Sequence, residues 1–198
     1  MRAGGEIVPS RCRVVDDGRQ VQMTRFAQVE VRASHGGHGV FVLEPVVTGA
    51  RILEFGGPRV GRRVVERAAA AGDGDGFLQI SADEFYALSG RADDFVNHSC
   101  APNTFIESEA GHFYLVAIRA IAAGEELYFD YGMTQIGFPF RFNCLCGAAA
   151  CRGPIGNYDE IPSTLLDQQR AKGMVPPHVE AAIQADHAPV RLSSPARS

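Results

Sequence analysis

Apolar residues along this chain gather in short runs that are separated by glycine, proline and polar residues. The runs are rich in Val, Ile and Phe and are too short for most helices, so each is typical of a β-strand. They fall at Val29 to Val31, Gly39 to Leu43, Arg51 to Phe55, Phe77 to Ile80, Phe113 to Ile118 and Glu126 to Phe129. The pattern therefore predicts a mainly β fold of small sheets with short helices.

Two segments have helical character instead. Residues Arg62 to Ala71 predict a short helix that ends at Gly72, followed by an Asp-Gly loop, as an insertion between strands. Ser163 to Lys172 predicts a second helix, with Ser163 as its N-cap. The tail from about residue 175 has few large apolar residues and is expected to be loosely held or disordered. Residues 1 to 26 are expected to form an extension with a hairpin turn at residues 16 to 18.

Composition narrows the class of protein. The 198 residues fit one domain plus tails, and 45% hydrophobic residues, 21% charged residues and a net charge of −4 are those of an ordinary globular chain. Basic residues cluster only briefly, as at Arg62-Arg63, so no direct nucleic-acid binding is expected. The N-terminus lacks a signal-like apolar stretch, and no run approaches the roughly 20 apolar residues that cross a bilayer. We therefore expect a soluble intracellular protein, either cytoplasmic or nuclear, without a membrane partner.

Five segments carry the chemistry. Asp94 to Asn103 reads Asp-Phe-Val-Asn-His-Ser-Cys-Ala-Pro-Asn, and Ala123 to Gly132 reads Ala-Gly-Glu-Glu-Leu-Tyr-Phe-Asp-Tyr-Gly. Gly-His-Gly-Val-Phe at 37–41 and Ile-Leu-Glu-Phe-Gly-Gly at 52–57 precede them, and a cysteine segment at 142–153 follows. Taken in chain order, the five segments resemble those of the SET-domain lysine methyltransferases that carry a post-SET cysteine segment. The resemblance covers about residues 28 to 155. Each piece alone is weak, but five in family order are highly specific.

The resemblance implies an architecture. It predicts a SET fold, with small β-sheets around a C-terminal pseudoknot, plus a post-SET zinc lid. The predicted divisions are an N-terminal extension (1–26), a SET domain (27–134, with an insertion at about 58–76), a post-SET zinc segment (138–155) and a C-terminal helix with a loosely ordered tail (156–198). The resemblance also implies transfer of methyl groups from S-adenosylmethionine to a lysine of a protein substrate in an extended segment, such as a histone or histone-like tail.

The predicted cofactor site combines backbone and polar groups. Gly37 and Gly39 have no side chain, which suits a backbone that must turn sharply or approach a ligand closely. A plain β-turn would explain these glycines too. By resemblance, Gly37, His38, Gly39, Asn97, His98 and Tyr131 bind the cofactor. Asn97 would hold its amino-acid end, and His98 would contribute mainly main-chain contacts.

By resemblance, Tyr131 is the catalytic residue and lines a lysine pocket with Phe55 and Phe129. Methyl transfer needs the lysine nitrogen, the methyl carbon and the cofactor sulfur nearly in line. The main task of the enzyme is therefore to position these three atoms. Phe129 falls at the family's Phe/Tyr switch, where Phe leaves space for a methylated amine and predicts di- or trimethylation. Phe55 stands where the family often has Tyr, and it could instead be an ordinary core residue. Asp94 stands where the family commonly has Arg.

The cysteines favour a metal. Cys144 and Cys146 are poorly placed to bond to each other, and with Cys151 they supply three thiolates, whereas structural zinc takes four ligands. Cys100 can supply the fourth, and by resemblance the post-SET segment folds over its loop. The alternative is four buried, inert thiols. Cys12 is expected to be a free thiol.

Two rival functions fit some of these features. A SET-like module that binds peptide or cofactor without efficient transfer would explain Phe55 and Asp94, but retention of Asn97 and Tyr131 argues against it. A purely structural zinc-stapled domain would explain the cysteines but not the paired Gly-Glu-Glu and Asp-Tyr-Gly motifs.

Overall fold

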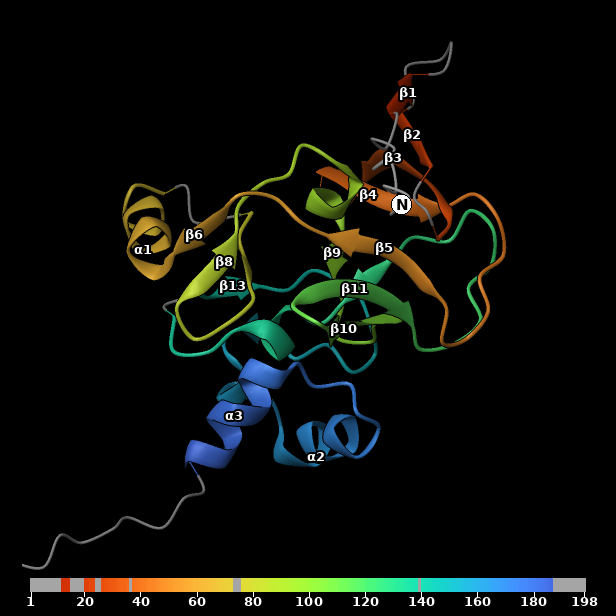
Figure 1. The fold of residues 1–198 in the computed structure, drawn as a ribbon. Helices are drawn as coiled ribbons and strands as arrows, with labels where there is room; N and C mark the ends of the chain where they lie inside the picture. Colours follow the sequence, from red (N-terminus) through yellow and green to blue (C-terminus); the bar gives the residue numbers. More distant parts are fainter. Residues whose placement is uncertain are drawn as a thin grey trace, which may run out of the picture.

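The computed structural model describes residues 12–14, 20–23, 26–35, 37–72, 76–138 and 140–186, with β1 and β2 described by their backbone alone. It is built from small sheets (Figure 1). An antiparallel sheet in the order β1-β2-β3-β4 contains β1 (Cys12–Val14), β2 (Gln20–Met23), β3 (Gln28–Ser34) and β4 (Gly37–Val42). A second, in the order β10-β11-β5, contains β5 (Arg51–Phe55), β10 (Thr104–Glu109) and β11 (His112–Ala117). The predicted mainly β fold is confirmed.

Alternating apolar residues of these two sheets form the main core. Strand residues with period two place one face inward, and Val40, Val42, Ile52 and Leu115 are completely buried. The predicted strands at 29–31, 39–43, 51–55 and 113–118 all fall within or overlap β3, β4, β5 and β11.

The predicted insertion is part of a third sheet, in the order β6-β8-β7. It contains β6 (Arg59–Gly61), β7 (Leu78–Gln79) and β8 (Glu84–Tyr86), and α1 (Arg62–Ala70) follows β6 directly. Because β6 pairs with β8, this unit continues past residue 76 and packs as one body on the left of Figure 1. Val65 and Phe85 hold the helix against the sheet, with Phe138 from a later segment.

The C-terminal region holds two helices, α2 (Ser163–Ala171) and α3 (Pro177–Asp186). The prediction of a loosely held tail from about residue 175 is wrong for residues 177–186, because Val179 and Ile183 are buried against Met133 and Tyr158. Ser163 is the first residue of α2 and not its cap; Pro162 occupies the N-cap position. The predicted turn at residues 16–18 lies outside the described residues, although β1 and β2 on either side pair antiparallel.

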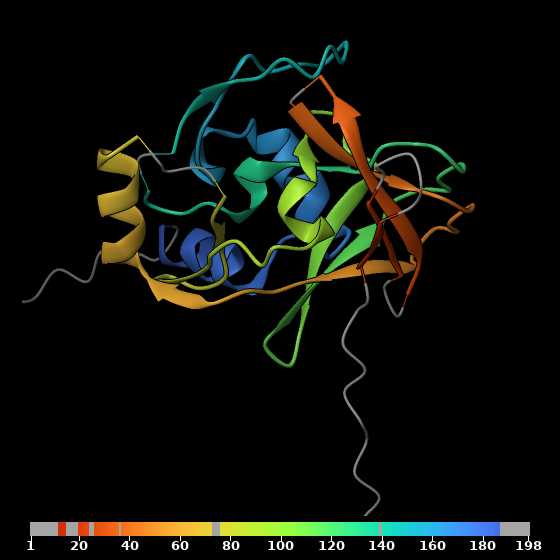
Figure 2. The same ribbon diagram turned by 90° about the horizontal axis from the view of Figure 1, so that it is seen from above.

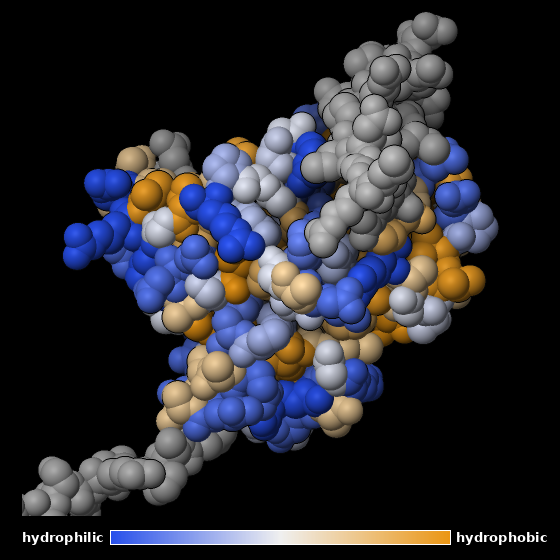
Figure 3. All heavy atoms as spheres, viewed as in Figure 1, coloured by the Kyte–Doolittle hydropathy of each residue, from blue (hydrophilic) through white to orange (hydrophobic). Residues whose placement is uncertain are grey.

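Hydrophilic residues cover much of the surface over α1 and the C-terminal helices, and hydrophobic residues show between these units (Figure 3). Within the described part of the chain, every helix is too short or too polar to cross a membrane.

Candidate active site and metal centre

The centre of the molecule is a parallel pair of very short strands, β9 (Asn97–His98) and β12 (Tyr128–Phe129). Asn97 lies opposite Tyr128, and His98 lies opposite Phe129. The 3-10 helix η2 (Tyr131–Thr134) begins directly after β12. The Tyr131 amide therefore reaches His98 Nδ1 at 3.1 Å, and its phenol donates to the Val96 carbonyl at 2.8 Å. Two motifs far apart in sequence thus meet at Tyr131.

An aromatic cavity of about 450 Å³ opens beside this pair. Phe55, Phe129 and Tyr131 line it, with ring centroids 5.7 Å apart for Phe55 and Phe129 and 4.7 Å apart for Phe129 and Tyr131. The three predicted lysine-pocket residues therefore share one wall. Aromatic faces suit an alkyl chain that ends in a cationic or polarised nitrogen.

Asn97 connects this cavity to the glycine-rich strand β4. It lines the cavity, and its Nδ2 donates to the His38 carbonyl and to Glu126 Oε1, both at 2.8 Å. A Cβ on Gly39 would lie 2.1 Å from Glu126 Oε1, so residue 39 must be glycine for this arrangement. Gly37 has a φ of +102°, which also favours glycine. The predicted cofactor residues of β4 thus lie beside Asn97.

Glu126 is a buried residue that accepts hydrogen bonds from several elements, and sequence analysis did not single it out. Its carboxylate accepts hydrogen bonds from the Ser34 hydroxyl at 2.7 Å and the Tyr128 hydroxyl at 2.6 Å, in addition to Asn97. Glu126 therefore fixes β3, β9 and β12 relative to one another. The Gly-Glu-Glu motif was the available signal, but only the fold shows that its second carboxylate points inward.

The four predicted ligands come together at the post-SET segment. The Sγ atoms of Cys100, Cys144, Cys146 and Cys151 all lie within 4.8 Å of one another. Those of Cys100 and Cys144 are 3.8 Å apart, the spacing expected for thiolates at about 2.3 Å from a tetrahedral zinc ion. Burial raises the pKa of the Cys100 and Cys144 thiols, so a thiolate cluster here needs a cation. The donor set fits zinc. The side chain of Cys12 lies outside the described residues.

His98 joins this cluster to Tyr131. Burial is the largest influence on its pKa, which is lowered to about 4, so the ring is neutral at pH 7. Its Nδ1 accepts from the Tyr131 amide, which assigns the proton to Nε2. Nε2 lies 3.4 Å from Cys100 Sγ and can donate to that sulfur. The imidazole is therefore a structural link between the thiolate cluster and the aromatic cavity.

A buried ion pair makes a second link that sequence analysis missed. The Arg152 guanidinium makes two hydrogen bonds to Asp130, at 2.5 and 2.7 Å, and the side chains are only 13% and 7% exposed. Arg152 follows Cys151 in sequence, and Asp130 precedes Tyr131. β13 (Phe142–Asn143) and β14 (Pro154–Ile155) pair across the post-SET segment, which arches over one side of the molecule in Figure 2. The pair fastens this segment to the residue next to Tyr131.

The Asp94 departure has a local structural role. Its carboxylate accepts hydrogen bonds from the backbone amides of Ser89, at 2.9 Å, and Gly90, at 2.6 Å. These bonds close the loop before η1 (Ala92–Phe95). Asp94 therefore stabilises the conformation of this loop.

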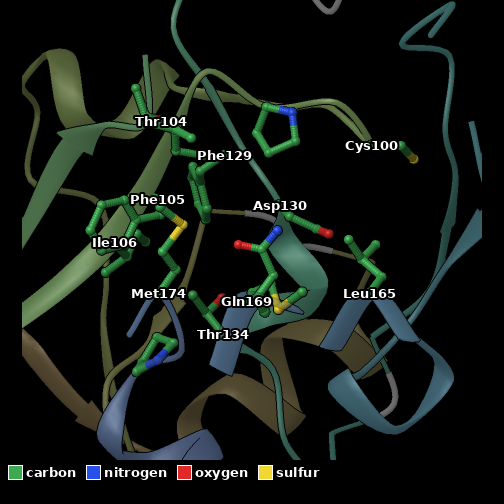
Figure 4. A pocket seen from close by; sticks show the side chains of 14 residues that line it. Cys100, Thr104, Phe105, Ile106, Phe129, Asp130, Thr134, Leu165, Gln169 and Met174 are labelled. Carbon is green, nitrogen blue, oxygen red and sulfur yellow. The ribbon is translucent and has the colours of Figure 1, made fainter. Parts of the chain in front are cut away.

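A second, small cavity of about 30 Å³ lies behind Phe129 (Figure 4). Phe129, Asp130 and Thr134 line it, together with Leu165 and Gln169 of α2. Phe129 and Thr134 line both cavities and lie between them.

Comparison with known proteins gives a consistent picture. Residues 37–132 match the family model described as SET domain. The chain is 32% identical over 164 residues to a probable histone-lysine N-methyltransferase set-23 of Caenorhabditis elegans, covering 74% of this chain and 66% of that protein. It is 31% identical to histone-lysine N-methyltransferase SUV39H2 of Gallus gallus (71% and 41% coverage) and 30% identical to histone-lysine N-methyltransferase 2B of Homo sapiens (61% and 5%). The chain thus spans two thirds or less of these relatives' own lengths.

Proposed function

The chain belongs to the SET-domain histone-lysine methyltransferase family, and on that premise we propose that it transfers methyl groups from S-adenosylmethionine to a lysine side chain of a protein substrate. The observation that carries this proposal is the cavity lined by Phe55, Phe129 and Tyr131, with Asn97 at its edge. A structural zinc module would need no such aromatic cavity.

The polar groups around Asn97 suit the cofactor's amino-acid end. Both Asn97 Nδ2 bonds are made within the protein, whereas its Oδ1 accepts no hydrogen bond among the described residues. That oxygen would accept from the ammonium of S-adenosylmethionine. Gly37, His38, Gly39 and His98 would supply backbone contacts beside it.

Lysine methylation at this site would rely on positioning. When bound, S-adenosylmethionine supplies a sulfonium methyl that the amine lone pair displaces, forming an N–C bond as the C–S pair returns to sulfur. The aromatic pocket lowers the pKa of the substrate lysine from about 10.4, because it disfavours the ammonium, and the proton leaves to water. Tyr131, held by its bond to Val96, would orient the amine.

The cysteine cluster would hold a structural zinc ion. Cys100, Cys144, Cys146 and Cys151 supply four thiolates and leave no open position for chemistry. The metal would stabilise the post-SET segment against the loop that carries Asn97 and His98.

An extended protein segment is the substrate class that we propose. Phe77, Leu78 and Tyr86 line the cavity, as do Phe140 and Phe142, and an extended segment would pack against these side chains. Because the relatives are named histone-lysine methyltransferases, a histone or histone-like tail is the first substrate to test.

Phe129 supports a di- or trimethyl product. Its ring has no hydroxyl to hold a water beside the amine, so a methylated nitrogen has room to rotate. Phe129→Tyr should shift the product towards monomethyllysine with little loss of the first transfer. If wild type stops at one methyl under excess cofactor, this assignment is wrong.

Mass spectrometry after incubation with S-adenosylmethionine and histone or peptide libraries tests the main proposal. Mass gains of methyl groups on lysine are expected. Peptide or cofactor binding without any transfer would favour the alternative, a catalytically weak SET-like binding module.

A further inference from the structure

His178 connects the C-terminal helix α3 to the short helix that begins at Tyr131. It lies in the first turn of α3, and its Nε2 is 2.9 Å from the carbonyl oxygen of Thr134, the last residue of η2. A carbonyl oxygen can only accept a hydrogen bond, so Nε2 carries the proton and donates it. α3 is therefore hydrogen-bonded to the end of η2.

The surroundings of His178 show what a histidine contributes at this place. Its Nδ1 is sealed from solvent and has no hydrogen-bond partner among the described residues, and the ring of Phe113 lies edge-on to it with centroids 6.4 Å apart. Burial lowers the pKa of His178, so the ring is neutral at pH 7. A buried nitrogen without a partner is destabilising, and an apolar side chain would avoid that cost. The bond to Thr134 is what the histidine adds.

Thr134 passes this contact on to Tyr131. Thr134 is only 2% exposed, and its hydroxyl donates to the Tyr131 carbonyl at 3.0 Å. The Tyr131 amide and phenol are bonded to His98 and to the Val96 carbonyl, respectively. The contact at the Tyr131 carbonyl thus depends on Thr134, whose own carbonyl is held by His178.

Apolar packing between α3 and η2 does not supply this direction. Val179 and Ile183 are buried in one cluster with Met133 of η2, and α3 lies below β10 and β11 in Figure 1. Burial of apolar surface is non-directional, so it holds the two helices together without fixing where a carbonyl points. A hydrogen bond weakens steeply when its angle changes. His178 therefore restrains the rotation of η2.

We propose that His178 is a positioning residue for Tyr131, because its bond to the Thr134 carbonyl fixes the orientation of η2 in which Tyr131 lines the lysine pocket. This inference rests on the proposed methyltransferase function. His178 does not line the aromatic cavity, so it acts on the reaction through Thr134. Methyl transfer is sensitive to the placement of the reacting atoms, so a small rotation of η2 slows transfer without weakening cofactor binding.

The test compares two substitutions of His178 in the full, zinc-loaded chain. His178→Leu removes the donor, whereas His178→Gln keeps an N–H group at a similar reach. Mass spectrometry follows methyl transfer from S-adenosylmethionine to a peptide that wild type methylates. We expect kcat of His178→Leu to fall about three- to tenfold, the effect of one lost hydrogen bond, with both KM values within about twofold of wild type. His178→Gln should recover kcat to within about twofold.

Two control variants separate positioning from stability. His112→Leu removes a histidine whose side chain is 58% exposed and should leave kcat unchanged. Ile183→Ala removes packing further along α3 and keeps His178, so it should lower the melting temperature more than His178→Leu does. Its kcat, measured well below the unfolding temperature, should stay within about twofold of wild type. If Ile183→Ala slows transfer as much as His178→Leu, general loosening of α3 explains the effect and the inference is refuted.

NMR of the imidazole nitrogens of wild type tests the hydrogen bond without measuring activity. At pH 7 we expect His178 to be protonated at Nε2 and unprotonated at Nδ1. The opposite tautomer or a charged ring would overturn the inference.

The remaining outcomes distinguish the two proposals. No transfer by folded wild type to any peptide would overturn the proposed function, whatever the NMR result. Transfer by wild type with wild-type kcat in His178→Leu, or a loss that His178→Gln does not recover, would overturn the role of His178 alone. If His178→Leu does not fold, His178→Phe repeats the comparison, and failure of both to fold would make His178 a structural residue and refute the inference.

Discussion

The ion pair between Arg152 and Asp130 should contribute far more to the stability of the fold than its place in a short C-terminal segment suggests. Arg152→Met removes the guanidinium but keeps much of the alkyl packing. The Asp130 carboxylate then stays buried, with the Gly132 amide at 3.1 Å as a remaining donor. An unpaired buried charge is the costly state, because the lost interaction is not replaced by water.

The expected cost follows from burial. Removing one partner of a buried pair typically costs about 3–5 kcal/mol, and the remaining Gly132 bond argues for the lower end. Arg141 and Glu160 form a matched exposed pair in the same region, with side chains 61% and 36% exposed. Arg141→Met should cost only about 0–1 kcal/mol. At roughly 2–4 °C per kcal/mol for a chain of this size, the melting temperatures should fall by about 6–12 °C and by less than about 4 °C, respectively.

Thermal unfolding with zinc present throughout checks this prediction, and hydrogen exchange locates the loss. Amides of residues 140–156 and of Tyr131 should lose protection together in Arg152→Met. Asp130→Leu combined with Arg152→Met should recover part of the stability, since no unpaired charge remains. The reasoning is refuted if Arg152→Met is no less stable than Arg141→Met.

Four further predictions concern the cofactor, the metal and catalysis. Asn97→Ala should weaken S-adenosylmethionine binding in calorimetry with little change in melting temperature; an unchanged affinity would remove Asn97 from the site. Gly39→Ala should weaken the same binding, because the new methyl group must displace Glu126; wild-type affinity would show that Glu126 moves freely. Metal analysis should find one zinc per chain, with chelation exposing residues 138–155 before the core, and metal-free protein from a reducing, chelator-free preparation would contradict the site. Tyr131→Phe should keep cofactor affinity within a few-fold but reduce turnover, and wild-type turnover would exclude the role of its hydroxyl.

Local motifs were enough to predict the mainly β fold and the residues that meet at Tyr131. The strands that define the core are short apolar runs rich in Val, Ile and Phe, and such runs depend only on neighbouring residues. By contrast, α3 has few large apolar residues and gains its stability by burying Val179 and Ile183 on other elements. The sequence contains no local signal for such packing.

Contacts between residues that lie far apart in the chain were also not predicted from the sequence. Asp130 and Arg152 are 22 positions apart and become neighbours only because the post-SET segment folds back over the site. Glu126 was visible as a motif residue, but its inward orientation depends on β12 pairing with β9.

The position of Phe129 between the two cavities has a consequence for how this protein can change. Its ring lines the proposed lysine pocket and also the small cavity, whose lining includes Leu165, Gln169 and Met174. Because packed interiors transmit changes in volume, a larger side chain at Met174 would restrict the ring, and a smaller one would let it retreat. Natural variation or an inhibitor acting behind the ring could thus retune product methylation while every residue that contacts the substrate stays the same.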